Sequence, residues 1–80
     1  MDTRIITLDT LPCGQWGTVT ELRCRPDAER RFQDMGLVPG TRIKCVMKSP
    51  LSDPCAYLIR DAVIAIRRQD GKDIYVGAAM

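Results

Sequence analysis

The sequence contains no histidine among its 80 residues. Histidine is the commonest general base and the commonest neutral metal ligand, so its absence excludes every catalytic triad built on imidazole. The sequence also carries no nucleophile–base pair and no glycine-rich phosphate loop. We therefore expect a binding module that is not an enzyme, with no catalytic residue and no cofactor.

Long apolar runs are absent as well. The longest mostly apolar stretch, Ala62 to Ile66, is about a quarter of the ~20 residues that a membrane span requires. The N-terminus lacks a basic segment followed by an apolar one, which is the pattern of a secretory signal. These absences predict a cytoplasmic protein that does not insert directly into a membrane.

The sequence has neither a strong net charge nor a cluster of aromatic residues. Twelve Lys and Arg against ten Asp and Glu leave a formal charge of +2, too mild to require a phosphate backbone as partner. Two arginine pairs, Arg30-Arg31 and Arg67-Arg68, have no aromatic companions and are interpreted as solvated surface. The four aromatic residues are scattered: Trp16, Phe32, Tyr57 and Tyr75. The sequence thus predicts no nucleic-acid partner.

The four cysteines contain no Cys-x-x-Cys pair, because ten, twenty and nine residues separate them. The paired-thiolate geometry of a zinc knuckle is therefore missing. Cys45 and Cys55 fall on predicted strands and are expected to pack as small buried hydrophobes, with the thiols reduced. We predict no metal ligand. The alternative is a thiolate-based metal-binding or sensing protein, whose first candidate ligands are Cys13, Cys45 and Cys55.

Residues 26–35 predict a helix, because Pro26 suits the first turn and acidic residues follow it near the positive end of the helix dipole. Three residues at i, i+4, i+7 spacing form its apolar face: Ala28, Phe32 and Met35. Two i, i+4 ion pairs are expected on its exposed side: Asp27 with Arg31, and Arg30 with Asp34. Gly36 is expected to cap the helix, with Leu37 folding back onto the apolar face.

Pro39-Gly40 predicts a type II turn that launches a strand. Short strands are predicted in the ranges 4–8, 17–22, 41–48, 55–60, 62–67 and 74–76. Val19 and Leu22 are out of phase for strict alternation, which fits a bulge. In 41–48 the inward residues are expected to be Ile43, Cys45 and Met47. The polar segment 69–72 is predicted to be a turn, and the last four residues are expected to fray.

These elements form one domain over residues 1–80. About five short strands and one helix give too little sheet for a sandwich. They suit a mainly β protein, a small antiparallel barrel with the short helix inserted in a loop.

Two blocks of sequence, taken together at the spacing they have here, are a strong family signal, whereas short pieces of them are weak ones. The blocks are Asp34-Met35-Gly36-Leu37-Val38-Pro39-Gly40-Thr41 and Pro50-Leu51-Ser52-Asp53-Pro54. Together with the flanking residues they match a family pattern over a core of about residues 8–76: Leu11, Gly14, Gly17, Val19 and Leu22 before them, and Ile64-Ala65-Ile66-Arg67 after. In this order the chain resembles the FeoA family. Two positions depart from the family's pattern: Asp61 stands where Gly is usual, and Gly71 where Ala is usual.

The resemblance implies an SH3-like barrel that acts as a small cytosolic component of bacterial ferrous-iron uptake. It implies docking on the membrane transporter FeoB, through the transporter's cytosolic G domain or its membrane part, and modulation of its activity. The same domain type is fused to the C-terminus of DtxR-like repressors.

The candidate contact surface combines the block from Arg31 to Thr41 with a patch on the adjacent sheet face that departs from the family. Positions 56, 58 and 63, commonly polar in the family, are Ala56, Leu58 and Val63 here, and with Val46 they could form an exposed apolar patch. Coverage of this face by the helix or a terminus is an equally weighted alternative. The patch could also serve a homo-oligomer. The predicted partner-binding residues are Arg31, Asp34, Met35, Leu37, Val38, Pro39, Leu58 and Val63.

Overall fold

The computed structural model describes residues 3–51 and 53–79. Six strands, two helices and one 3-10 turn follow one another in this order: β1 (Thr3–Thr7), η1 (Leu8–Thr10), β2 (Trp16–Leu22), α1 (Pro26–Asp34), β3 (Arg42–Lys48), β4 (Cys55–Ile59), β5 (Ala62–Ile66), α2 (Arg68–Gly71) and β6 (Ile74–Ala79). Ser52 of the proline loop and Met80 of the C-terminal end lie outside the described residues.

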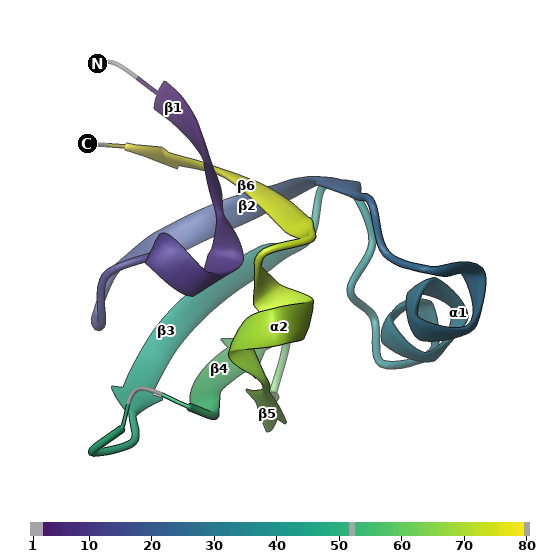
Figure 1. The fold of residues 1–80 in the computed structure, drawn as a ribbon. Helices are drawn as coiled ribbons and strands as arrows, with labels where there is room; N and C mark the ends of the chain where they lie inside the picture. The colour runs from purple at the N-terminus through teal and green to yellow at the C-terminus, as the bar shows by residue number, and fades with distance from the viewer. Residues whose placement is uncertain (1–2, 52, 80) are drawn as a thin grey trace.

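The strands form one antiparallel sheet in the order β1-β6-β2-β3-β4-β5. In Figure 1, β1, β6 and β2 lie in the upper part and β4 and β5 at the bottom, with β3 running between them; α1 stands apart at the right. The mainly β expectation is confirmed. Within the described ranges the six strands fall on the six segments predicted as strands, although the barrel was expected to have about five; there are two helices where one was expected.

The extra structure comes from the C-terminal third of the chain. Gly77, Ala78 and Ala79 were expected to fray, but they continue β6, which lies between β1 and β2 and pairs with both. Small residues have little β-propensity of their own, so this strand depends on partners far away in the sequence. Likewise, the segment 69–72 does not form a simple turn but belongs largely to α2, where the N–H of Gly71 bonds to the carbonyl of Arg67 at 2.9 Å.

Two irregularities in the pairing set which side chains face the core. The bulge expected in β2 is confirmed by a register shift between Val19 and Glu21. A second shift, in β3 between Cys45 and Met47, was not anticipated. A bulge adds one residue and reverses the side-chain phase beyond it. Met47, expected to point inward, is therefore 62% exposed, whereas Ile43 and Cys45 are buried as predicted.

The core is a single apolar cluster to which nearly every element contributes: Leu8, Leu11, Val19, Phe32, Leu37, Ile43, Cys45, Cys55, Tyr57, Ile59, Ile66, Ile74, Val76 and Ala78. Of its side chains, Tyr57 brings a polar group inside, and its hydroxyl donates to the Leu8 carbonyl at 3.3 Å. No charged residue of the described ranges is fully buried. Burial of this cluster is the main force that curls the sheet around it.

The exit from α1 follows the predicted chemistry. The N–H of Gly36 bonds to the carbonyl of Gln33 and that of Leu37 to the carbonyl of Phe32, both at 2.9 Å, which is the Schellman pattern. Gly36 has φ of +91°, a conformation that costs glycine nothing. Leu37 folds back into the core beside Phe32, as expected.

The next turn is also as predicted. The N–H of Thr41 bonds to the carbonyl of Val38 at 3.0 Å, and Gly40 has φ of +95°, as a type II turn around Pro39-Gly40 requires. In the hairpin between β4 and β5, where Asp61 stands at a position that is usually Gly in the family, the residue with positive φ is Arg60, at 56°.

Candidate functional site

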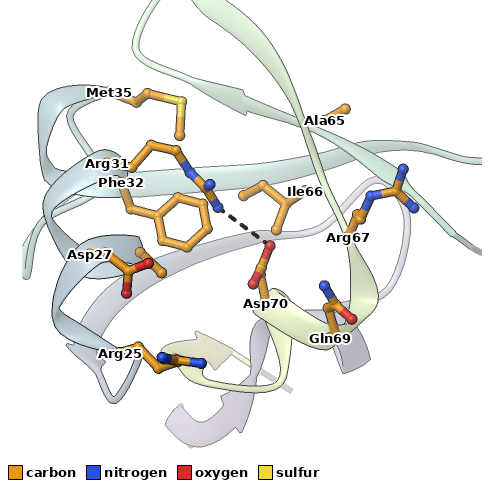
Figure 2. A pocket seen from close by; sticks show the side chains of 11 residues that line it. Arg25, Asp27, Arg31, Phe32, Met35, Ala65, Ile66, Arg67, Gln69 and Asp70 are labelled. Atoms are coloured by element: carbon orange, nitrogen blue, oxygen red, sulfur yellow. Dashed lines mark ion pairs between the residues drawn. The ribbon is translucent and has the colours of Figure 1, made fainter.

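A groove of about 600 Å³ lies between α1 on one side and the end of β5 with α2 on the other. Figure 2 shows the side chains that line it. We call this feature the α1–β5 groove, and its lining residues are Arg25, Asp27, Ala28, Arg31, Phe32, Met35, Ala65, Ile66, Arg67, Gln69 and Asp70. Its size falls within the range of small-molecule and peptide sites.

The floor of the groove is apolar and its rim is charged. Phe32 and Ile66 are buried at the base, while Met35, at the C-terminal end of α1, is 38% exposed. The apolar face predicted for the helix is thus only partly used by the core. Arginines and aspartates surround the floor, which is the arrangement of an apolar interface centre with a polar rim.

Arg31 spans the groove through an ion pair. Its Nη2 lies 3.7 Å from Oδ2 of Asp70, and the dashed line in Figure 2 shows this pair spanning from α1 to α2. The guanidinium also lies 5.1 Å from the centre of the Phe32 ring. The sequence predicted Asp27 as its partner instead. An exposed i, i+4 pair gains little, and α2 brings Asp70 to the opposite wall of the groove.

A second feature adjoins the groove on the outside of the sheet. Leu58 is half-buried, and in the pairing it lies opposite Lys44 of β3 on one side and Val63 of β5 on the other. Val63 is 62% exposed, so neither α1 nor any terminal residue within 3–79 covers it. We call this the outer apolar face, and its residues are Val46, Met47, Ala56, Leu58, Val63 and Ala65.

Ala65 joins the two features, because it lies two residues after Val63 on β5 and also lines the groove. The sequence did not single out Ala65, Ile66 or Asp70. Their participation depends on the distance between α1 and β5, which hydrophobic periodicity does not report. The site is therefore continuous from Met35 across Ala65 to Val63.

The predicted contact residues divide into four groups. Arg31 and Met35 line the groove, and Leu58 and Val63 lie on the outer apolar face. Asp34, Val38 and Pro39 lie beyond them at the helix end and in the following loop, outside the groove lining; Asp34 and Pro39 are exposed and Val38 is half-buried. Leu37 has no exposed surface, so its inclusion was wrong: the helix cap turns its side chain into the core.

The cysteines follow the packing interpretation in part. Cys45 and Cys55 are buried in the core, whereas Cys13 is exposed and Cys24 is half-buried. Burial is the largest cause that raises the pKa of the Cys45 thiol, and the neighbouring Cys13 adds to it. In the described part of the chain, no three His, Cys, Asp or Glu side chains are placed to hold a metal ion.

Trp16 shows a relationship that the sequence did not reveal. It is 41% exposed at the start of β2, and the cationic groups of Arg42 and Lys44 lie 4.7 Å and 5.7 Å from its ring centre. These residues meet because β2 and β3 pair at this point. The cluster belongs to the β2–β3 side of the sheet, outside the groove lining.

Over residues 3–51 and 53–79, neither helix has the length and the apolar character needed to span a bilayer. The curled six-stranded sheet, its single apolar core and the helix-flanked groove define a small β-barrel domain. The FeoA domain model matches residues 6–78, and the chain belongs to the FeoA family. The FeoA domain is linked to ferrous-iron transport.

Comparisons with individual proteins agree with this assignment. The chain is 33% identical over 69 residues to a fusion of Fe(2+) transport protein A and Fe(2+) transporter FeoB from Porphyromonas gingivalis. That match covers 86% of this chain but only 8% of the fusion protein's length.

Solved structures give the same picture. The FeoA protein of Chlorobium tepidum has a TM-score of 0.88 at 29% identity, over 94% of this chain and 71% of that one. The FeoA of Stenotrophomonas maltophilia, solved with zinc and described as a prokaryotic SH3 domain protein, has a TM-score of 0.78 at 27% identity, over 89% of this chain and 88% of that one. The SH3-like expectation is confirmed.

Proposed function

We propose that this chain is a cytosolic, non-enzymatic accessory component of bacterial ferrous-iron uptake that docks on a FeoB-type transporter and modulates it. The contact surface is the α1–β5 groove together with the outer apolar face. The observation that carries the proposal is the Porphyromonas gingivalis relative, in which a matching segment and a FeoB transporter share one polypeptide.

Fusion has a physical consequence for a separate chain. A tethered domain meets its neighbour at a high effective concentration, on the order of millimolar for a short flexible linker. A chain that is not tethered must supply the missing affinity through its own surface. Exposed apolar residues beside a charged rim provide such a surface: Val63 and Met47 are each 62% exposed on the outer apolar face, and Met35 is 38% exposed in the groove.

The rim gives the contact its orientation. Arg25, Arg31 and Arg67 surround the groove, whereas Asp70 is engaged by Arg31. Arginine suits bidentate contacts with carboxylates, so the transporter surface is expected to present acidic groups around an apolar centre. Modulation then follows from binding one conformation of the transporter better than another.

Pull-down of the purified cytosolic domain of a FeoB-type transporter by this chain tests the proposal. The experiment is run without nucleotide, with GDP and with a non-hydrolysable GTP analogue. The proposal expects specific retention, with different retention in at least one nucleotide state. Equal background recovery with this chain and with an unrelated SH3-like domain in all three states contradicts it.

A further inference from the structure

β5 is an edge strand that lacks the charged residues and prolines that often protect an edge. Among the strands in the described ranges, only β4 pairs with it. Its five residues, Ala-Val-Ile-Ala-Ile, include no charge and no proline. Proteins normally blunt an exposed edge with such residues, because unpaired backbone groups there recruit another strand. The opposite edge strand, β1, differs from β5 because it contains a charged residue, Arg4, and has a threonine at each end.

The open edge of β5 presents a defined set of backbone groups. β4 and β5 are joined by a two-residue turn, so Ile59 and Ala62 form the pair that closes the hairpin. In such a hairpin the closing pair exchanges both hydrogen bonds, and the bonding direction alternates along the strand. The N–H and C=O groups of Val63 and Ala65 therefore point away from β4, toward the open edge.

We propose that a second copy of this chain pairs its β5 antiparallel to this edge, with Ile64 of the two copies on the two-fold axis. Residues directly opposite in an antiparallel pair face the same side of the sheet, which restricts the allowed registers. The register centred on Ile64 pairs all of Ala62–Ile66. It places Val63 of each copy opposite Ala65 of the other. The N–H and C=O groups that Val63 and Ala65 direct toward the open edge then bond to one another in both of these pairs.

The charges beyond the strand ends fit the same register. Asp61 precedes β5 and Arg67 follows it. Pairing centred on Ile64 brings Asp61 of one copy opposite Arg67 of the other, at both ends of the interface. Two opposite-charge pairs then flank an apolar centre, so the strand is complementary to itself.

The α1–β5 groove provides room for the incoming strand end. Ala65, Ile66 and Arg67 line the groove on the β5 side, and α1 stands across it (Figure 2). Asp61 of the second copy enters at this end, beside Arg67. The interface consists of one short strand and its flanks, so it is smaller than a standard stable interface and the dimer is weak and concentration-dependent. The inference does not rest on the proposed function, but the two occupants exclude one another, because the second copy enters the same α1–β5 groove that the proposed transporter contact uses.

Sedimentation velocity of the purified full chain, from micromolar concentration to about 1 mM, tests the inference. At a total concentration of about 1 mM, a dimer with a dissociation constant of about 1 mM has half of its chains paired. A reversible monomer–dimer equilibrium is expected. Ala65→Pro removes an N–H that points to the open edge, so it abolishes the dimer while the β4–β5 pairing remains. Ala65→Ser keeps the N–H and is expected to dimerise normally. Far-ultraviolet circular dichroism checks the fold of both variants.

Charge reversal makes the test independent of proline. Asp61→Arg and Arg67→Asp each place like charges opposite one another, and each is expected to raise the dimer dissociation constant about tenfold or more. An equimolar mixture of the two variants restores opposite charges in a mixed dimer, and dimerisation is expected to recover. A chain that stays monomeric at every concentration overturns the inference. So does a dimer that survives Ala65→Pro and ignores charge reversal, because its contact lies elsewhere.

Discussion

The carboxylate of Asp53 accepts a hydrogen bond from the backbone N–H of Arg68 at 2.9 Å. Asp53 lies in the loop between β3 and β4, and Arg68 is the first residue of α2. The N–H of Asp53 in turn donates to the hydroxyl of Ser49 at 2.8 Å. Asp53 therefore holds the start of α2, and with it one wall of the α1–β5 groove.

Replacing Asp53 with Ala removes the acceptor for the Arg68 N–H. We expect the free energy of unfolding to fall by about 1 kcal/mol, as for loss of a helix cap at a solvent-exposed site. Urea denaturation followed by circular dichroism measures this change. Asp53→Asn keeps an acceptor oxygen and is expected to lose less. Equal stability of Asp53→Ala and the wild type would show that the hydrogen bond contributes nothing.

Gly36 and Gly40 form a matched pair for testing backbone strain. Both have positive φ, +91° and +95°. A Cβ at Gly40 would meet no atom within 4 Å, whereas a Cβ at Gly36 would lie 3.3 Å from Nε of Arg60. Each Gly→Ala change is expected to cost about 1–2 kcal/mol of unfolding free energy for the left-handed conformation.

The two glycine variants are compared in the same urea titration. Arg60 is exposed, and its flexible side chain can move aside, so Gly36→Ala is expected to be only slightly worse than Gly40→Ala. A Gly40→Ala variant as stable as the wild type would contradict the type II turn.

Leu37 and Met35 are neighbours in the sequence, but only Leu37 is fully buried. Leu37→Ala opens a cavity in the core and is expected to destabilise the fold by about 2–5 kcal/mol. Met35→Ala removes a partly exposed side chain at the rim of the groove, and a loss below about 1 kcal/mol is expected. Thermal and urea unfolding of both variants give the comparison. Similar losses in both would mean that Leu37 does not occupy the core.

Alkaline pH is expected to weaken the fold. Burial raises the pKa of the Cys45 thiol above its ordinary value of 9.0 and the pKa of the Tyr57 hydroxyl above its ordinary value of 10.0. The folded state therefore keeps protons that the unfolded chain releases. The stabilisation is complete below about pH 9 and is lost as the pH rises toward the raised values.

The matching measurement is the urea midpoint at about pH 8 and about pH 10.5, under a reductant. A lower midpoint at the higher pH is expected. Tyr57→Phe removes one of the groups that titrate, so its midpoint should fall less between the two pH values. A midpoint that rises with pH would contradict the burial of these groups.

The features predicted from the sequence are those that depend on chemistry within a few residues. The cap at Gly36 and the turn at Pro39-Gly40 require a particular φ and one or two local hydrogen bonds, and glycine and proline encode both. The bulge near Val19 likewise appears as a break in local alternation. Val63 was found as a surface candidate because it is apolar at a position that is commonly polar in the family. Met35 was assigned by periodicity to the apolar face of the helix and entered the contact prediction as part of the block from Arg31 to Thr41, so its partial exposure was not predicted.

Features that depend on distant partners were missed. Gly77 and Ala78 belong to an inner strand only because β1 and β2 flank them, and the β-propensity of these two residues does not predict a strand. Arg31 selects Asp70 because α2 packs across the groove from α1. The outward turn of Met47 follows from a one-residue shift against β4. Part of the candidate site was missed for the same reason, since Ala65 gains its role from the placement of α1.

The central claim is that the α1–β5 groove and the outer apolar face bind the transporter. Calorimetric titration of a FeoB-type cytosolic domain with Val63→Asp, and with Met35→Glu, tests it against Ile5→Asp, a similarly exposed apolar residue on the opposite sheet edge. The account predicts that the first two variants weaken binding at least about tenfold and that Ile5→Asp binds like the wild type. Unchanged binding of Val63→Asp and Met35→Glu, or loss of binding in Ile5→Asp alone, would contradict it.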